Sequence, residues 1–180
     1  MEIIKVEEGT PADLADRLPR ERHTYEFLDQ LQIPFLRVDH QPAATIADCS
    51  MVDEVLGVSM CKNLFLTNAQ RTKFYLLLMP GEKKFKTKDL SKQINSARLS
   101  FGEGEYMEKF LEISPGAVSI MGLINDREQA VQLLIDREIL EQEFLGCHPC
   151  VNTSSMRISM KDILGKFLPA LQREYQEVVL

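Results

Sequence analysis

The chain has 180 residues, of which 44% are apolar and 27% are charged, so it is long enough for one domain with a substantial core. No apolar run approaches the ~20 residues that span a bilayer, and the N-terminal stretch MEIIKVEEGT has no apolar signal-peptide segment; we therefore expect a cytoplasmic protein without membrane contact. The net charge of −6 at pH 7 argues against broad, non-specific nucleic-acid binding.

Helix and strand signals follow one another irregularly through the first half. Thr10, Pro11 and Asp13 have the pattern of a helix start, and we expect residues 1–22 to form a helical extension before the main domain. Thr45 is placed to cap a later helix that Gly57 would end. The other elements expected in this half are a helix over 24–32, a strand over 34–40, and two paired strands over 60–68 and 73–80.

The second half carries two further helix patterns before its strands begin again. A Pro115-Gly116 turn should feed a strand, and Gly146 should end a short helix. Ser159 with Asp162 has the spacing that caps a final helix. In chain order, the pattern predicts helices over 87–94 and 104–113, a strand within 114–126, a strand over 130–136, a helix over 137–145, a last strand over 156–159 and a last helix over 160–168.

The order of these elements indicates the fold class. Several neighbouring strands are joined by short connections, which suits antiparallel pairing better than a doubly wound sheet. We therefore expect an α+β fold with a mixed, mainly antiparallel sheet flanked by helices. Neither GxGxxG nor GxxxxGK[ST] occurs in the sequence, so nothing indicates a nucleotide cofactor.

The stretch GCHPCVNTSS places Cys147 and Cys150 in a CxxC spacing. A redox pair of this kind normally opens a helix, whereas the residues that follow lead into a strand. A zinc site would need two more ligands; Cys61 is the candidate third, while His23 and His40 are isolated. Buried thiols packing as small hydrophobes are the simplest interpretation for Cys150, and for Cys147 packing and a functional role stay open. We expect no metal and no cofactor.

Lysines supply two further candidate binding sites. Lys62 lies in an apolar strand, on the face expected for Leu64 and Leu66, so it must reach the edge, pair with an anion or line a polar cavity. The stretch EKKFKTKDLSK, residues 82–92, has five lysines against one Glu and one Asp. It is either a solvated face or a set of phosphate contacts.

The Pro115-Gly116 turn could present backbone N–H groups to a ligand, because a glycine does not block their approach; an ordinary turn is the alternative. The sequence contains no GxSxG or HExxH motif and no recognisable Ser-His-Asp order. The residues alone therefore indicate a pocket built from Lys62, Gly116 and His148, without naming its reaction.

Five stretches together resemble the prolyl-tRNA editing domain family, the YbaK/ProX-like aminoacyl-tRNA deacylases. They follow the family's order and approximate spacing between about His23 and Leu180: KNLFL at 62–66, YLLLMP at 75–80, RLSF at 98–101, PGAVSIMGLIND at 115–126 and GCHPCVNTSS at 146–155. The likeness is greatest to freestanding enzymes that hydrolyse alanine mischarged onto proline tRNA. It implies an editing domain over residues 23–180 with a partly barrel-like sheet, acting as a trans-editing hydrolase on the aminoacyl ester.

The resemblance also implies roles for single residues. Lys62 matches the family's lysine, which is thought to engage the tRNA near its terminal adenosine, and Asn63 follows it as in the alanine-specific subgroup. Gly116 matches the glycine of the GxxxP loop that helps hold the aminoacyl group, whereas the loop's proline is Ile120 here. His148 matches the pocket histidine. We further expect substrate contacts from Thr45, Ala117, Ser119 and Asn152, and tRNA contacts from Lys83, Lys84, Lys86 and Lys88.

The expected partner is the acceptor end of mischarged proline tRNA, with prolyl-tRNA synthetase as a second candidate and either a monomer or a homodimer as the assembly. Three alternatives stay open: a deacylase for serine or cysteine, a catalytically silent tRNA-binding relative, and a thiol oxidoreductase that uses Cys147 and Cys150.

Overall fold

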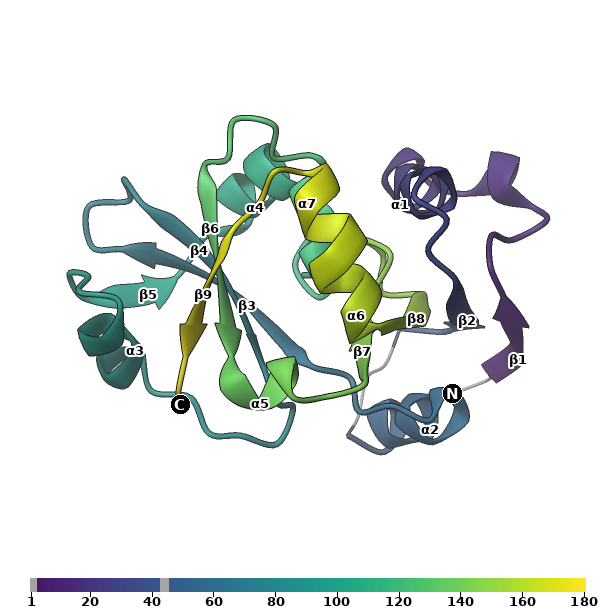
Figure 1. Cartoon of the computed structure of the whole chain (residues 1–180), viewed down its shortest axis with the longest axis horizontal. Coiled ribbons are helices and arrows are strands. Elements are labelled where there is room, and N and C mark those ends of the chain that lie inside the picture. Colours follow the sequence, from purple (N-terminus) through teal and green to yellow (C-terminus); the bar gives the residue numbers. More distant parts are fainter. Residues whose placement is uncertain (1–2, 43–45) are drawn as a thin grey trace.

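A computed structural model describes residues 3–42 and 46–180 and contains two sheets (Figure 1). The four-stranded sheet has the order β1-β2-β8-β7 and is antiparallel throughout. The five-stranded sheet has the order β5-β3-β4-β6-β9, with antiparallel pairs at β3 and parallel pairs at β6. The strands are β1 (Ile3–Glu8), β2 (Phe35–His40), β3 (Lys62–Asn68), β4 (Phe74–Met79), β5 (Leu99–Phe101), β6 (Val131–Asp136), β7 (Phe144–Cys147), β8 (Ser154–Ser159) and β9 (Tyr175–Val178).

Helices lie around and between the two sheets (Figure 1), and the mixed, mainly antiparallel α+β architecture is confirmed. The final helical segment changes winding in its middle, where a π-helical turn joins two short α-helical pieces. The α-helices are α1 (Pro19–Gln30), α2 (Ile46–Leu56), α3 (Thr87–Gln93), α4 (Gly104–Leu111), α5 (Arg137–Leu140), α6 (Met160–Asp162) and α7 (Leu168–Ala170). Two 3-10 helices, η1 (Leu14–Asp16) and η2 (Ile120–Ile124), and the π-helix η3 (Ile163–Phe167) complete the set in the described ranges. No helix in the described ranges is both long and apolar enough to cross a membrane.

The two sheets meet at Gly146. Met60 forms an isolated parallel bridge with Gly146, and the Cys61 N–H donates to the Gly146 carbonyl at 3.3 Å. A Cβ at position 146 would lie 3.0 Å from the Met60 sulfur and 3.1 Å from the Ser59 carbonyl oxygen. The close approach of these backbones therefore favours glycine at position 146.

The N-terminal prediction of a helical extension over 1–22 is wrong for most of its length. Residues 3–8 form β1, which pairs with β2, and the Thr10 hydroxyl donates to Asp29 at 2.6 Å instead of capping a helix. Helix α1 begins at Pro19 and runs through the expected boundary at residue 22. The division into 1–22 and 23–180 stays a prediction.

Three further expectations were wrong in the second half. The segment 114–126 contains η2, because the Ser119 side chain accepts from the Met121 N–H and starts a tight helical turn. The helix expected over 137–145 ends at Leu140, and the next residues form β7 because they pair with β8. Strand β9 was missed: its short segment is mostly exposed and forms a strand through parallel pairing with β6. Ser159 lies at the N-terminus of α6 as expected, without a side-chain capping bond.

Strand β3 separates two apolar cores. Phe65 belongs to the larger core, with Phe74, Leu76 and Leu78, whereas Leu66 belongs to a smaller core with Leu77, Leu90 and others. Successive side chains of a strand point to opposite faces, so β3 is buried on both. Leu90 comes from α3, which covers the smaller core.

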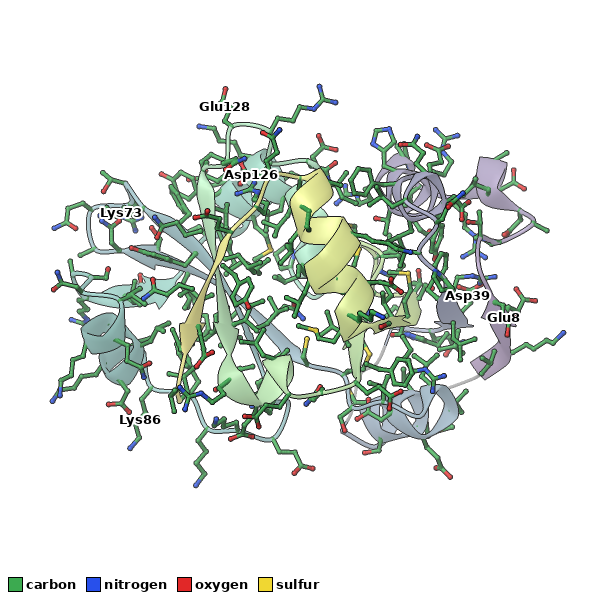
Figure 2. The ribbon with its side chains drawn as sticks, in the orientation of Figure 1. Glu8, Asp39, Lys73, Lys86, Asp126 and Glu128 are labelled. Carbon is green, nitrogen blue, oxygen red and sulfur yellow. The ribbon has the colours of Figure 1, made fainter. Side chains whose placement is uncertain are left out.

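A buried ion pair joins Arg173 to Asp126, which is labelled in Figure 2, next to the start of β6. Arg173 donates to the Asp126 carboxylate and carbonyl, both at 2.6 Å, and to the Val131 carbonyl at 2.9 Å. The same carboxylate accepts from the backbone N–H groups of Ala130 and Val131. This cluster fixes the start of β6 against the segment that leads into β9.

We expect Asp126→Ala to lower the free energy of unfolding by about 3–5 kcal/mol, because it leaves the Arg173 charge buried without its partner. Urea unfolding followed by circular dichroism measures this loss. Glu128→Ala removes an exposed carboxylate from the same loop and should change stability by less than about 0.5 kcal/mol. Equal effects of the two substitutions would contradict a structural role for the pair.

The CxxC cysteines pack inside the larger core, as their simplest interpretation predicted. Cys147 and Cys150 are buried and Cys61 is partly buried, whereas Cys49 is exposed; all four are free thiols. Burial raises the pKa of the Cys61 and Cys150 thiols to about 12 and that of Cys147 well above its ordinary value. These thiols therefore lack the thiolate character that redox catalysis needs.

Thiol titration of the native protein with a disulfide reagent should show one fast-reacting cysteine, Cys49. A pKa of about 12 instead of 9 lowers the thiolate fraction roughly a thousandfold at neutral pH, so the buried thiols should react only after denaturation. Cys49→Ser should abolish the fast phase. A fast phase that persists in Cys49→Ser and disappears in Cys147→Ser would instead support redox chemistry.

Candidate functional site

The first two residues of β3 point in opposite directions and divide the expected site. The Lys62 ammonium donates to the Lys83 carbonyl oxygen at 2.8 Å, on the face of β3 that carries Leu64 and Leu66. Asn63 lies on the other face, where its side-chain amide donates to the carbonyl and to the sulfur of Cys61 at 3.2 Å and 3.1 Å. The strand therefore places Lys62 and the remaining expected pocket residues on different faces.

On the Lys62 face, a cavity of about 570 Å³ lies between β3, β5 and the start of α3. Its lining combines Lys62 and Leu64 with Phe85, Phe101 and the lysines of the α3 start. Lys84, Lys86 and Lys88 are exposed, and among the described ion pairs none involves them. This face offers positive charge next to aromatic rings.

Lys83 is a correction to the predicted tRNA contacts. Its ammonium lies 2.9 Å from a carboxylate oxygen of Asp136 and 2.8 Å from one of Glu138. Asp136 is fully buried and also accepts from the Glu138 N–H at the start of α5. A buried carboxylate needs a cationic partner, so Lys83 serves the fold and is removed from the candidate phosphate contacts.

On the Asn63 face, an acceptor is left unfilled. The Asn63 Oδ1 is buried and receives no hydrogen bond from any residue in the described ranges. A buried polar atom without a partner is costly and calls for an explanation, such as a bound donor. This atom is therefore the clearest indication of a ligand on this side of β3.

The Gly116 loop is a tight turn in which the Ala117 N–H donates to the Ser114 carbonyl at 3.2 Å. Gly116 has φ +93°, a backbone conformation that only glycine adopts without strain. A Cβ there would also lie 3.7 Å from the Asn152 amide nitrogen. Because Ala117 uses its N–H inside the turn, the Gly116 N–H is the amide of this pair that remains for a ligand.

Ser119 ties this loop to the histidine segment. Its hydroxyl donates to the His148 carbonyl at 2.6 Å and lies within hydrogen-bonding reach of the Cys147 thiol. Ile120, which stands where the family has proline, is fully buried in the larger core. An apolar side chain thus replaces the proline by packing inward, and the turn at Gly116 is retained.

His148 is held in one orientation. Its Nδ1 lies 2.8 Å from the Ser154 carbonyl oxygen, so Nδ1 carries the hydrogen and Nε2 keeps a free lone pair. Burial lowers the pKa of His148; the hydrogen bond to Ser154 opposes that shift and the nearby His40 adds to it. The imidazole is therefore neutral at pH 7.

His40 was not expected at this site, because it is isolated in the sequence. Pairing of β2 with β8 brings it to the site, where its Nε2 lies 2.8 Å from the Ser155 hydroxyl and its ring centroid lies 6.4 Å from that of His148. The Ser155 hydroxyl is also 3.3 Å from the His148 Nδ1. A serine thus links two histidines that are distant in sequence.

A hydrogen-bond network from the N-terminal region supports Ser154, the residue that orients His148. The Tyr25 hydroxyl donates to Glu21 at 3.0 Å and lies 3.2 Å from the Ser154 hydroxyl. Arg17 pairs with Glu21 at 3.0 Å and with Asp39 at 2.7 Å. The N-terminal region, through Tyr25, therefore contributes to the strand that orients His148, a role that sequence reasoning missed.

The structure brings most of the expected pocket residues to one side of β3. These are Asn63, which contacts the partly buried Cys61, and Gly116, Ala117, Ser119, His148 and Asn152. Lys62 faces the other cavity, and Thr45 lies outside the described residues. In the part of the chain that the structure describes, no group of three His, Cys, Asp or Glu side chains could hold a metal ion.

Comparison with known proteins identifies the family. The sequence model of the aminoacyl-tRNA editing domain matches residues 40–165. The chain is 30% identical over 136 residues to the prolyl-tRNA editing protein ProX of Acetoanaerobium sticklandii, covering 76% of this chain and 83% of that protein. It is 27% identical over 164 residues to prolyl-tRNA synthetase associated domain-containing protein 1 of Danio rerio, covering 90% and 85%.

A solved structure supports the fold. It is described as a candidate trans-editing enzyme for prolyl-tRNA synthetase and superposes with a TM-score of 0.67 at 14% identity, covering 91% of this chain and 98% of that one. The family model, which spans more than half of the chain, and the match to ProX place the chain in the aminoacyl-tRNA editing domain family of prolyl-tRNA editing proteins.

Proposed function

We propose that the protein is a trans-editing hydrolase that removes alanine from mischarged proline tRNA by cleaving the aminoacyl ester. The observation that carries the proposal is the unfilled Asn63 acceptor on the same side of β3 as the Gly116 turn. The α-ammonium of an aminoacyl group is a donor that would satisfy Asn63, and the ester carbonyl would then lie toward the turn. The name of the ProX relative supports this substrate class.

Hydrolysis of the aminoacyl ester requires few catalytic groups from the protein. An aminoacyl ester is already activated, so hydrolysis depends on a positioned water and on stabilising the tetrahedral oxyanion. The Gly116 N–H is the proposed oxyanion donor. His148, neutral and with its Nε2 lone pair free, forms the wall of the pocket and can accept a hydrogen bond from the attacking water.

Substrate selection would follow from size. Alanine is smaller than proline, so a synthetase pocket that accepts proline cannot exclude it, and missing methylenes supply only about 1–3 kcal/mol of discrimination. An editing site corrects this error by admitting only the smaller residue. The buried wall formed by Ser119, Ile120 and Cys147 is the proposed limit on the size of the side chain that enters.

Lys62 would act on the other side of the strand. Its ammonium sits at the mouth of the cationic cavity, where the terminal adenosine of the tRNA could reach it while the aminoacyl group turns over the end of β3. The relatives associated by name with prolyl-tRNA synthetase make that enzyme the proposed protein partner. The protein is proposed to act in the cytoplasm as a monomer or a homodimer.

The alternative functions differ in the chemistry that they require of the site. The raised pKa of the buried thiols argues against the oxidoreductase. A deacylase for serine or cysteine needs the same site with a polar side-chain contact, and a silent relative would bind tRNA without hydrolysis. The identity of the amino acid released decides among these.

Proline tRNA charged separately with alanine, serine, cysteine and proline tests the proposal. We expect fast release of alanine, and release of proline slower by at least about tenfold, because the pocket excludes the larger ring. Release of all four amino acids at equal rates, or of none, would contradict the assignment. Preferred release of serine or cysteine would replace alanine with that residue.

Gly116→Ala should lower the single-turnover rate by at least about tenfold, since a side chain at φ +93° strains the turn and shifts the proposed oxyanion donor. Gly165→Ala is the matched control, because its new Cβ would meet no atom within 4 Å. Full activity in folded Gly116→Ala protein would exclude the loop from the reaction.

Lys62→Ala should lower kcat/KM by about tenfold to a hundredfold, because a charge-assisted contact is lost.

Substitutions of Lys86 and Lys88 should affect tRNA binding, whereas substitution of Lys83 should affect stability. Lys86→Gln with Lys88→Gln should raise the KM for tRNA and flatten its dependence on salt by about 0.7–0.9 log unit per lost phosphate contact. Lys83→Gln should instead lower the unfolding temperature, because it leaves Asp136 buried without its cation. A larger effect of Lys83→Gln than of the double variant on the salt dependence would reverse this assignment.

A further inference from the structure

The cationic face of the larger sheet carries an exposed aromatic ring that the proposed catalytic residues do not use. Phe101 is 62% exposed, at the end of β5, the edge strand of its sheet. A large apolar side chain this exposed often marks a contact surface. Phe101 pairs with Leu66, and directly paired residues share a face, so it projects on the same face as Lys62.

Phe85 holds this ring from one side. The two ring centroids are 6.2 Å apart and the planes are inclined by 67°, an edge-to-face contact that covers at most one face of Phe101. Both rings line the cavity of about 570 Å³ that also contains Lys62, Lys86 and Lys88. The volume is within the range of small-ligand sites.

A second cavity of about 620 Å³ continues from the first along α3, sharing Thr87 and Lys88 and adding Lys92 and Arg98. No acidic side chain lines either cavity. None of Lys86, Lys88, Lys92 or Arg98 makes an ion pair within the described ranges, whereas neighbouring Lys83 makes two. On a chain of net charge −6, this is a concentration of unpaired positive charge.

An aromatic ring set in a groove of unpaired cations is the arrangement that binds unpaired nucleotides, since any base can stack on the ring while its phosphates contact lysine and arginine. Leu66, which is opposite Phe101, lies four positions after Lys62 in β3, about 13 Å along the strand. The groove is therefore longer than one base. An acidic peptide would use the charges without needing an open aromatic face.

We infer that Phe101 and Phe85, with Lys92 and Arg98, form a binding site for the single-stranded 3′ end of the tRNA, in which a base upstream of the terminal adenosine stacks on Phe101. The inference rests on the proposed function, because it takes tRNA as the ligand. It places the RNA nucleotides that precede the terminal adenosine in the groove along α3, and the terminal adenosine at Lys62. Phe101 is a binding residue here and has no part in the chemistry of the ester.

The test uses a fluorescent RNA hexanucleotide ending in CCA and the full-length protein. Binding is followed by anisotropy, and stacking by the quenching of 2-aminopurine placed at each of the last three positions in turn. Phe101→Ala should weaken binding by about tenfold or more and abolish quenching at one position, whereas Phe101→Tyr should preserve both. Arg98→Gln should lower the salt dependence of binding and leave the quenching in place.

Two controls make the result specific. Leu18→Ala removes another exposed apolar side chain, 58% exposed in the native structure, and Lys73→Gln removes a lysine well away from Lys86 (Figure 2); neither should alter binding. Wild-type affinity and quenching in Phe101→Ala would overturn the inference. So would an oligoglutamate peptide that competes fully with the RNA and whose own binding is unchanged in Phe101→Ala.

Deacylation assays separate this inference from the proposed function. In Phe101→Ala the KM for alanylated proline tRNA should rise while the single-turnover rate at saturating tRNA stays the same. If the wild type deacylates and Phe101→Ala is identical to it in KM and RNA binding, the inference fails and the proposed function stands. If the wild type binds RNA with Phe101-dependent quenching but releases no amino acid, the site stands and the proposed function fails.

Discussion

The antiparallel pairing of β3 with β4 is the constraint on which the rest of the structure depends. It runs without a shift from Lys62 opposite Met79 to Thr67 opposite Phe74. Both strands are covered on both faces, so each successive side chain must enter one of two cores. A slip of one residue would move Lys62 to the side of the larger core and Phe65 to the side of the smaller core, which fixes the register strongly.

This constraint explains why the candidate site has two parts. The face with Lys62 opens to α3 and presents charge and aromatic rings, as a polyanionic strand requires. The face with Asn63 opens to the Gly116 turn and His148, and presents a small number of oriented polar atoms in an otherwise apolar setting. In the proposed function, one ligand would reach both faces by passing over the N-terminal end of β3, with its RNA on one side and its ester on the other.

The second sheet supplies the rigidity of the acyl side. Pairing of β8 with β2 and β7 fixes the Ser154 carbonyl, which in turn fixes the tautomer of His148. The Tyr25 contact to Ser154 extends this support to α1 and to the charges around Arg17. Buried polar groups of this kind are stable only when each is satisfied, so the orientation of His148 depends on the N-terminal region.

The sequence predicts the central strands, the α+β class and the turn at Gly116, because short apolar runs bounded by turn residues and a glycine in a Pro-Gly turn are local signals. The sequence also favoured core packing for Cys150, whereas for Cys147 it left packing and a functional role open. It could not determine that Lys83 pairs with Asp136, that His40 lies beside His148, or that β7 is a strand. Those outcomes depend on long-range strand pairing and burial, and only the tertiary structure decides which distant side chains a pairing brings together.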